Sequence, residues 1–431
     1  MADQTSADQT NMGRDFFTDR GLQLDPYPWL DDSRAKGRVR ELDGRGIIMV
    51  TGFSEASQML LDGDIFSAVI AAAGPTAPLP FVPQGSDISD QIVEHHHKFV
   101  GSETLLSYDG TRHAASRSLL NSLFTPSRLR ANEEYMRTLG TRMVAELVAK
   151  GQGEAIHNLA TPYVTLVIAD LLGVPEEDRA AIFEAVTAGP PPGSIDDADA
   201  GASLVHMAEK VGRIFAGYIQ DRRTAPQGDV LTTLATTKYP DGSEPSLADM
   251  AMLAIFLFAA GQDTSAKLLG SAIRYLAETE TMQDFLRADP AQIPAFIEEM
   301  LRLEGSSKVT HRLARKDTEL GGEPVPAGSR VVASLAGANR DPARWEDPNE
   351  FKLGRPRIKE HLAFGRGAHT CIGAPLARAE VRVILEQLLA QTSRIALSEA
   401  EHGPAGARRL SYEPSYIIRG LEALHVELTP R

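Results

Sequence analysis

The sequence predicts a mainly α-helical fold with small β-sheets, built as a single domain. Most of the chain between loops rich in proline and glycine has a helical pattern, and strand-like stretches are few and short. No internal repeat and no linker-like stretch divides the 431 residues. Because the N-terminus is polar, we expect a flexible tail over 1–20, followed by one domain over 21–431.

The strands and loops can be placed from local composition. Strand-like sequence covers three stretches, at 39–51, 318–332 and 416–428. Clusters of Pro and Gly predict loops over 74–85, 189–197 and 239–245.

The longest predicted helix begins at Ser246, which can cap with Asp249, and ends near Glu278. At 1.5 Å per residue it is roughly 50 Å long and crosses the molecule. Its first half is apolar, but a glycine and three polar side chains follow in AGQDTS, residues 260–265. A glycine inside a helix costs about 1 kcal/mol relative to alanine, and each unpaired buried polar group costs about 1–3 kcal/mol. We therefore expect these residues to interrupt the helix for a functional reason.

Composition excludes several partners. The net charge of −14 disfavours binding to a phosphate backbone, so we expect no nucleic acid partner. A single cysteine excludes a disulfide framework and fits the reducing cytoplasm. The N-terminus lacks a signal-peptide pattern, and the most apolar run, 250–260, is shorter than the roughly 20 residues of a membrane span. We expect a cytoplasmic protein without a membrane anchor.

The one cysteine, Cys371, lies in FGRGAHTCIG, residues 364–373. The glycines of this stretch permit tight turns and the close approach of a large flat ligand. A helix is expected to start at Ala374 and Pro375, and its free backbone amides favour a thiolate. A buried, inert cysteine is the alternative, but the flanking glycines and His369 favour a functional thiol.

This loop resembles the haem signature FxxGxHxCxG of the cytochrome P-450 haem-thiolate monooxygenases, which it matches at Phe364, Gly367, His369, Cys371 and Gly373. The resemblance implies the P-450 fold around a buried haem b (iron protoporphyrin IX), with Cys371 as the axial iron ligand. It also implies that Phe364 and Gly365 lie beside the cysteine and that His369 contacts a haem propionate.

Other segments resemble family motifs in the same order along the chain. Glu299 and Arg302 match the family's ExxR ion pair, and 344–351 resembles the segment that completes its network. His113 and Arg117 resemble a motif that contacts the propionates, and Arg312 matches a third propionate ligand.

AGQDTS resembles the family's oxygen-activation motif. The resemblance implies that Ala260 and Gly261 open the helix over the haem, while Asp263 and Thr264 form an acid and alcohol pair that delivers protons. A helix kink stabilised by Thr264 bonding back to a carbonyl is the simpler alternative, and both can hold together.

The resemblance also implies the reaction and its partners. One atom of O₂ would enter a hydrophobic small molecule, with electrons from a separate ferredoxin and an NAD(P)H-dependent ferredoxin reductase. We expect a monomer. Residues of the substrate pocket would include Phe256, Ala259, Val309 and Ile417.

Lys308, a charged residue near these motifs, has two interpretations. Its side chain contacts a substrate carboxylate, or it is solvated, and we favour the second interpretation. Arg366, Arg112 and Lys359 would form a basic patch for an acidic ferredoxin.

Two other functions stay open at this point. A peroxygenase would take oxygen from hydrogen peroxide and would have less need of Asp263 and Thr264. A haem-dependent binding or sensor protein would show no turnover, so oxygen consumption that depends on a reductant separates the three. The run His95-His96-His97 resembles a metal tract, but adjacent residues of a helix point in different directions, so we expect a solvated loop.

Overall fold

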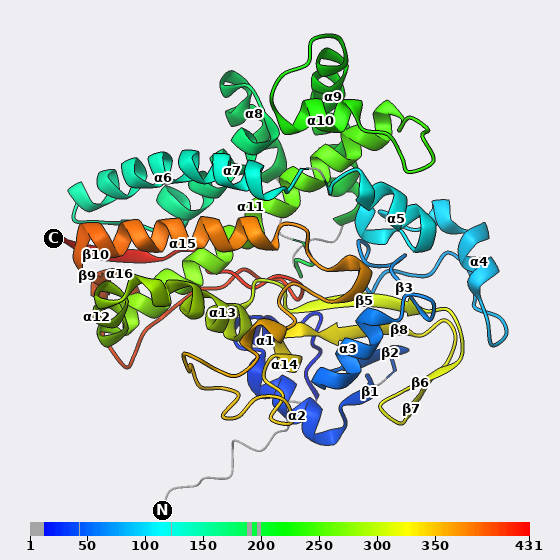
Figure 1. The fold of residues 1–431 in the computed structure, drawn as a ribbon. Helices are drawn as coiled ribbons and strands as arrows, with labels where there is room; N and C mark the ends of the chain where they lie inside the picture. Colours follow the sequence, from blue (N-terminus) through cyan, green and yellow to red (C-terminus); the bar gives the residue numbers. More distant parts are fainter. Residues whose placement is uncertain (1–12, 43, 122, 188–191, 196–199) are drawn as a thin grey trace, which may run out of the picture.

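The computed structural model describes residues 13–42, 44–121, 123–187, 192–195 and 200–431. Helices form most of it, and three small sheets lie beside them (Figure 1). The α-helices are α1 (Arg20–Leu24), α2 (Tyr27–Lys36), α3 (Phe53–Leu61), α4 (Ser89–Glu94), α5 (Gly110–Ser118), α6 (Pro126–Ala149), α7 (Thr161–Leu172), α8 (Glu176–Thr187), α9 (Ala200–Thr224), α10 (Val230–Thr236), α11 (Leu247–Glu278), α12 (Glu280–Ala288), α13 (Ile293–Glu304), α14 (Leu335–Ala338), α15 (Ala374–Gln391) and α16 (Glu399–His402).

Short helical turns and short strands complete the secondary structure. The turns are η2 (His96–Lys98), η3 (Leu105–Ser107), η4 (Ile156–Ala160), η5 (Pro290–Gln292), η6 (Ile358–Glu360) and η7 (Gly367–His369). The strands are β1 (Val39–Leu42), β2 (Ile47–Val50), β3 (Phe66–Ser67), β4 (Gln152–Glu154), β5 (Val309–Ala314), β6 (Thr318–Leu320), β7 (Glu323–Val325), β8 (Arg330–Ser334), β9 (Thr392–Leu397) and β10 (His425–Pro430). The predicted class, mainly α with small sheets, is confirmed.

The larger sheet has five strands in the order β1-β2-β8-β5-β3. Only β2 and β8 run parallel, with Ile48 opposite Val331, and the other neighbours are antiparallel. A second sheet, β4-β10-β9, lies near the C-terminus, and β6 and β7 form a separate hairpin. The larger sheet matters for function because β5 carries Arg312 towards the loop of Cys371.

The strand predictions are partly wrong. The stretch 39–51 does form the β1–β2 hairpin, and 318–332 contains β6, β7 and the start of β8. Of 416–428, only the end from His425 is a strand, because Ile417 and Ile418 hydrogen-bond to the Ser415 hydroxyl in an irregular loop. Strand β5 was not predicted, since its THRLA sequence places charged residues at buried positions.

The long central helix agrees closely with its prediction. The Ser246 side chain accepts a hydrogen bond of 3.0 Å from the Asp249 amide, and α11 then runs to Glu278. By length and apolar composition alone α11 could cross a membrane, but it packs against α7, α9, α13 and α15 within the protein. It is a core helix of this fold.

The predicted boundary of the N-terminal tail is wrong. Phe16 and Phe17 are buried, and they pack against Trp29 and Tyr416 with ring centroids 4.9 and 5.2 Å apart. Residues 13–20 therefore belong to the folded domain, because two aromatic rings bury apolar surface there. Positions 1–12 of the predicted tail lie outside the described residues, as does most of the predicted loop over 189–197.

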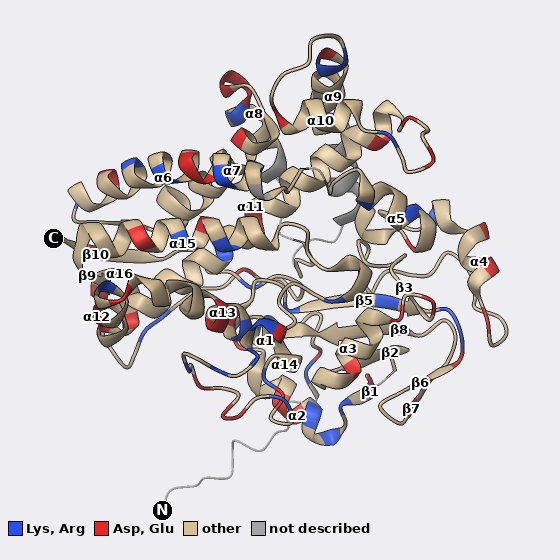
Figure 2. Cartoon of the chain, viewed as in Figure 1, with Lys and Arg blue, Asp and Glu red and all other residues tan. Residues whose placement is uncertain are grey.

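Charged residues of both signs are spread over the helices and loops rather than gathered on one element (Figure 2). The net charge of −14 therefore does not describe the electrostatic potential at any one site. The potential near the functional residues depends on the charged groups around them.

Candidate active site

The loop of Cys371 is built by two glycines with left-handed backbone angles. Gly365 has φ +67° and Gly367 has φ +75°, and a Cβ at Gly367 would lie 2.5 Å from the Leu60 carbonyl oxygen of α3. No other residue fits there without moving the backbone. The loop closes when the Cys371 amide donates to the Phe364 carbonyl at 2.9 Å, and α15 begins at Ala374 as predicted.

The surroundings of the Cys371 thiol shift its pKa in opposite directions. Burial among protein atoms raises the pKa of the thiol, although part of its surface remains accessible, and the amides of Gly373 and Ala374 and the Arg117 charge act in the opposite direction. The backbone amides at the start of α15 favour the thiolate, as expected, but burial has the larger effect and favours the neutral thiol. A metal cation would supply the charge needed for a thiolate, because a thiol that coordinates a metal is deprotonated.

Four cationic or ionisable side chains converge beside the cysteine, from α5, from β5 and from the loop itself. The rings of His113 and His369 lie 4.0 Å apart at 34°. Burial, together with the charges of Arg312, His113 and Arg117, lowers the pKa of His369 to about 3. Burial also lowers the pKa of Arg312 to about 10. Within the described residues none of the four forms an ion pair with a carboxylate.

These residues fit a haem. The buried Nε2 of His113 has no hydrogen-bond partner among the described residues, and Arg312 donates only to Thr310 and His311 beside it in the chain. Arg117 donates to the Thr370 carbonyl, which holds its guanidinium next to Cys371. Cations without counterions suit the two propionates of a haem, and a thiolate suits its iron.

On α11, residues 260–265 expose an accessible face in the middle of an otherwise buried helix. Ala260 is exposed, and Gly261, Asp263 and Thr264 are half-buried. The Thr264 hydroxyl donates to the Ala260 carbonyl at 3.0 Å, and the Thr264 carbonyl accepts a bond of 2.6 Å from Ser306. Asp263 forms an ion pair with Lys267 one turn further along.

The predicted interruption of the helix is wrong. Residues 260–265 remain α-helical throughout, so Ala260 and Gly261 do not open the helix. The glycine instead allows close packing, because a Cβ at Gly261 would lie 3.2 Å from the Ile168 side chain of α7, which is tighter than most such contacts. The back-bond of Thr264, which the simpler alternative required, is present.

The pair Glu299–Arg302 is fully buried. Arg302 donates to both Glu299 oxygens and to the carbonyls of Pro348 and Glu350, which lie in the predicted partner segment 344–351. Sequence reasoning missed Arg355, which donates to Glu299 at 2.7 Å. Its only sequence signal is a Gly-Arg-Pro run just beyond that segment.

A second network was missed as well. Glu298 accepts hydrogen bonds from Arg378 of α15 and lies 3.2 Å from His361, so it joins α13 to both ends of the Cys371 loop. These partners lower the pKa of Glu298 to about 2, against the opposing effect of burial. Arg378 also lies 4.6 Å from the centre of the Phe364 ring, which places that ring beside the loop.

The predicted pocket residues differ in exposure. Phe256, Ala259 and Ile417 are half-buried, whereas Val309 is only 3% exposed and packs in a cluster with Phe16 and Tyr416. The interpretation of Lys308 as a solvated side chain is wrong. Its ammonium is buried and donates to Gln23 Oε1 at 2.6 Å and to the Ser415 carbonyl, and burial lowers its pKa.

Glu380 of α15 is a buried acid that the sequence analysis did not single out. Neither carboxylate oxygen has a hydrogen-bond partner of normal geometry among the described residues, although the Ser265 hydroxyl of α11 lies near enough to favour the charged form. Burial dominates and raises the pKa of Glu380 to about 8. A protonated acid therefore lies between the cysteine helix and α11 at neutral pH.

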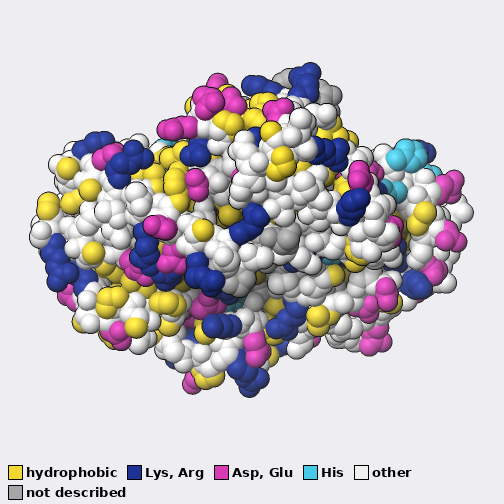
Figure 3. Space-filling view, turned by 45° about the horizontal axis from the view of Figure 1, so that its top comes forward, with side chains coloured by type: hydrophobic (Ala, Val, Ile, Leu, Met, Phe, Trp, Pro, Cys, Tyr) yellow, Lys and Arg dark blue, Asp and Glu magenta, His cyan; other side chains and the backbone are white. Residues whose placement is uncertain are grey.

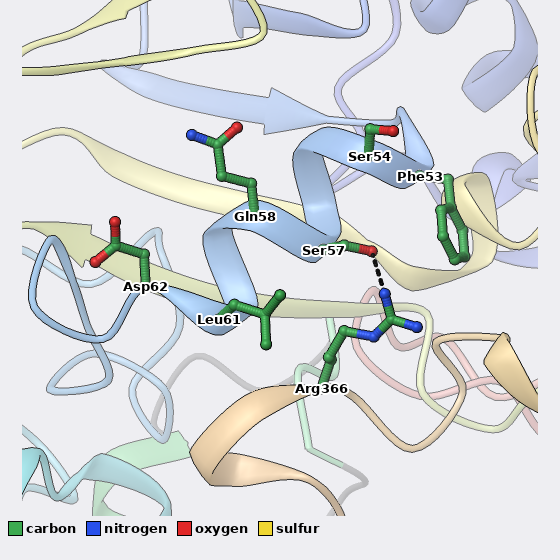
Figure 4. A pocket seen from close by; sticks show the side chains of 7 residues that line it. All are labelled: Phe53, Ser54, Ser57, Gln58, Leu61, Asp62 and Arg366. Carbon is green, nitrogen blue, oxygen red and sulfur yellow. Dashed lines mark hydrogen bonds between the residues drawn. The ribbon is translucent and has the colours of Figure 1, made fainter.

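A surface depression lies on α3 beside the Cys371 loop, outside the cluster of His113, Arg117, Arg312 and His369. Its lining residues come from α3 and the start of the loop: Phe53, Ser54, Ser57, Gln58, Leu61, Asp62 and Arg366 (Figure 4). Arg366 donates to the Ser57 hydroxyl at 3.3 Å, whereas Arg112 forms an ion pair with Glu103 and stacks on Tyr108. Lys359 is exposed. Arg112 belongs to the predicted basic patch, and Glu103 partly neutralises its charge.

The three histidines after α4 form no metal site with the carboxylates of the described residues. Histidine side chains lie at the surface in Figure 3, and His96 lies 3.5 Å from Glu103 while His97 is exposed. His95 and His96 are half-buried, and the centres of the His95 and Phe81 rings lie 5.1 Å apart, so the segment is solvated only in part.

A helical fold that presents one thiol at a helix start, among cations without counterions, defines a haem-thiolate protein. Residues 206–395 match the model of the family described as Cytochrome P450. Cytochrome P450 144 of Mycobacterium tuberculosis is 30% identical over 419 residues, which cover 95% of this chain and 90% of that protein. The chain belongs to the cytochrome P450 family.

Two further comparisons agree. Cytochrome P450 monooxygenase PikC of Streptomyces venezuelae is 31% identical, with 96% of this chain and 92% of that protein covered. The substrate-free structure of Mycobacterium marinum cytochrome P450 CYP150A6 is 45% identical with a TM-score of 0.90, and the match covers 98% of this chain and 100% of that chain. The protein is an oxidoreductase of the monooxygenase class, with haem iron as its cofactor.

Proposed function

We propose that this chain binds haem b through Cys371 and inserts one atom of O₂ into a hydrophobic small molecule. When bound, the haem supplies the activation of oxygen, as in other haem-thiolate proteins. The observation that carries the proposal is the convergence of His113, Arg117, Arg312 and His369 beside the only thiol, without a carboxylate partner among the described residues.

Each of these residues has a defined task. Cys371 ligates the iron from the rigid turn set by Gly365 and Gly367. Arg117 and Arg312 bind the propionates by charge-assisted hydrogen bonds, which are about twice as strong as neutral ones. His113 and His369, both held largely neutral by burial, donate further hydrogen bonds to the same groups.

Proton delivery is assigned to the accessible face of α11. The Thr264 hydroxyl can turn from the Ala260 carbonyl to hold a water, and Asp263 can exchange protons with solvent because it is half-exposed. A correctly placed acid of this kind contributes typically 10²–10⁴-fold to a proton-dependent step.

The substrate is proposed to be apolar. Phe256, Ala259 and Ile417 offer apolar side chains at partly open positions, and the one cation predicted near them, Lys308, is engaged with Gln23. Pockets of this kind select hydrophobic ligands such as terpenoids, aromatic hydrocarbons, steroids or fatty acyl compounds. We propose a soluble cytoplasmic monomer that receives electrons from a ferredoxin and its NAD(P)H-dependent reductase.

The test is a binding and turnover experiment on the purified haem-loaded protein. Candidate substrates are screened by the spin-state shift of the haem spectrum, and the best ligand is then supplied with NAD(P)H, ferredoxin and reductase. We expect product formation, with oxygen and NAD(P)H consumed together. Product formed only with hydrogen peroxide would indicate a peroxygenase, and tight binding without product in either case would indicate a sensor.

A further inference from the structure

Lys267 lies between two carboxylates at the middle of α11. Its side chain is only 6% exposed. The ammonium contacts the Asp263 carboxylate one helical turn before it and Glu413 Oε1 at 2.9 Å. Glu413 belongs to the loop over 412–421, far from α11 in the sequence.

The loop is shaped around this lysine. A Cβ at Gly420 would lie 2.4 Å from Lys267 Cγ and 2.6 Å from its Cδ and Cε, so only glycine leaves room for the aliphatic stem. The Glu413 amide donates to the Gly420 carbonyl at 3.0 Å, which closes the base of the loop around the ammonium. This is a built contact and not a chance surface pair.

A second connection joins the same loop to Thr264. Ser306 donates its hydroxyl to the Thr264 carbonyl at 2.6 Å, and its own carbonyl accepts from the Arg419 amide at 2.7 Å. Ile417, which we assign to the substrate pocket, lies two residues before Arg419. The acid and the alcohol of the proposed relay are thus both tied to the loop that carries a pocket residue.

One ammonium cannot fully neutralise two carboxylates. The buried Oε2 of Glu413 has no hydrogen-bond partner among the described residues. Burial is the main cause that raises the pKa of Glu413, with Asp263 and Glu422 adding as like charges and Lys267 opposing them. Asp263 and Glu413 therefore compete for Lys267.

We propose that Lys267 is a positioning residue for proton delivery: its ammonium is shared between Asp263 and Glu413, and a shift towards Glu413 releases the Asp263 side chain to act in the relay. The proposal rests on the relay role of Asp263 in the proposed function. Asp263 takes each proton from solvent and passes it on, and Lys267 takes part only by holding the Asp263 side chain. A substrate that presses on Ile417 would move the loop and alter this sharing.

The experiment compares Lys267→Met and Glu413→Gln in the haem-loaded protein with its redox partners. The pH profile of product formed per NAD(P)H consumed is measured for both variants, with Asp263→Asn for comparison. Lys267→Met should shift this profile, because it removes the ammonium from beside the Asp263 carboxylate. Glu413→Gln should shift the profile in the opposite direction, because Lys267 then contacts Asp263 alone.

Hydrogen exchange of the resting protein gives a second readout that does not depend on turnover. Amides of residues 412–421 should exchange faster in Lys267→Met and in Glu413→Gln. Lys267→Arg keeps the positive charge and should therefore keep the wild-type pH profile. Lys238→Met is the control, because Lys238 pairs with Glu244 at 3.0 Å on an exposed surface and should change neither readout.

The outcomes separate the two proposals. Unchanged exchange in both variants would overturn the tie between loop and helix. Faster exchange with an unchanged pH profile would show that Lys267 is only structural, which also overturns the inference. If instead Asp263→Asn and Thr264→Ala leave the wild-type profile and coupling intact, the relay itself fails, whatever the exchange shows.

Discussion

The Arg302 guanidinium holds both oxygens of the Glu299 carboxylate, at 2.9 and 2.7 Å, inside the core. Arg302→Met would leave Glu299 with Arg355 as its one charged partner among the described residues. It would also free the backbone carbonyls that Arg302 now binds. Breaking a buried pair of this kind costs about 3–5 kcal/mol, so we expect that loss in the free energy of unfolding. Urea unfolding measures it, with Lys238→Met as a surface control that should show almost no change. A loss for Arg302→Met as small as that of the control would contradict the assigned role.

Glu380 predicts a specific pH dependence of stability. Because burial raises its folded-state pKa to about 8, the native protein keeps this proton at a pH where the unfolded chain, near the ordinary value of 4.5, has released it. The native state binds more protons in that window, so stability is full below about pH 4.5 and is lost as pH rises towards 8, by at most about 1.4 kcal/mol per pH unit. Glu380→Gln should flatten the decline, since glutamine carries no titratable proton. Parallel unfolding curves for variant and wild type between about pH 5 and 8 would refute the assignment.

Thr264→Ala tests the proton relay. Removing the hydroxyl should leave oxygen consumption largely intact but divert reductant to hydrogen peroxide. Product per NAD(P)H should then fall at least several-fold, and at most by the factor of about 10²–10⁴ that is typical of proton-transfer groups. Thr236→Ala is a matched control, because Thr236 makes the same back-bond to a carbonyl of its own helix, at 2.9 Å, on α10. Equal coupling in the two variants would show that Thr264 serves only the helix.

Arg366→Glu tests electron delivery. Arg366 lies in the Cys371 loop, and its hydrogen bond to Ser57 leaves the charge unpaired by any carboxylate in the described part of the chain (Figure 4). Reversing this charge should slow reduction by an acidic ferredoxin about tenfold at low salt, and the difference should shrink as ionic strength rises. Arg112→Glu should have a smaller effect, since Arg112 already pairs with Glu103. Stopped-flow reduction rates that do not depend on ionic strength would rule out the patch.

The sequence contained enough information for the class and for much of the site. A single cysteine in a glycine-rich turn before a proline-marked helix start is a pattern that few classes of protein share, and Ser246 and Asp249 located the start of α11 because capping is a local effect. The pair Asp263–Lys267 has the i,i+4 spacing of a helical ion pair, although it was not among the predicted contacts.

Other features depend on contacts distant in the sequence. Arg355 reaches Glu299 only because the intervening chain folds back, and Lys308 is buried because Gln23 and Ser415 arrive from opposite ends of the chain. Gly261 was expected to break a helix, but the structure shows that it permits close packing on Ile168, which local propensity cannot reveal. Strand β5 was missed for the same reason, because its partner strands β3 and β8 come from distant parts of the sequence.

The most direct test of the account is the absorption spectrum of the reduced protein with carbon monoxide. If Cys371 is the axial ligand, the wild type should show the strongly red-shifted Soret band of thiolate ligation, and Cys371→Ser should lose that band while the protein stays folded by circular dichroism. A wild-type spectrum typical of histidine ligation, or a red-shifted band that survives in Cys371→Ser, would contradict the central claim.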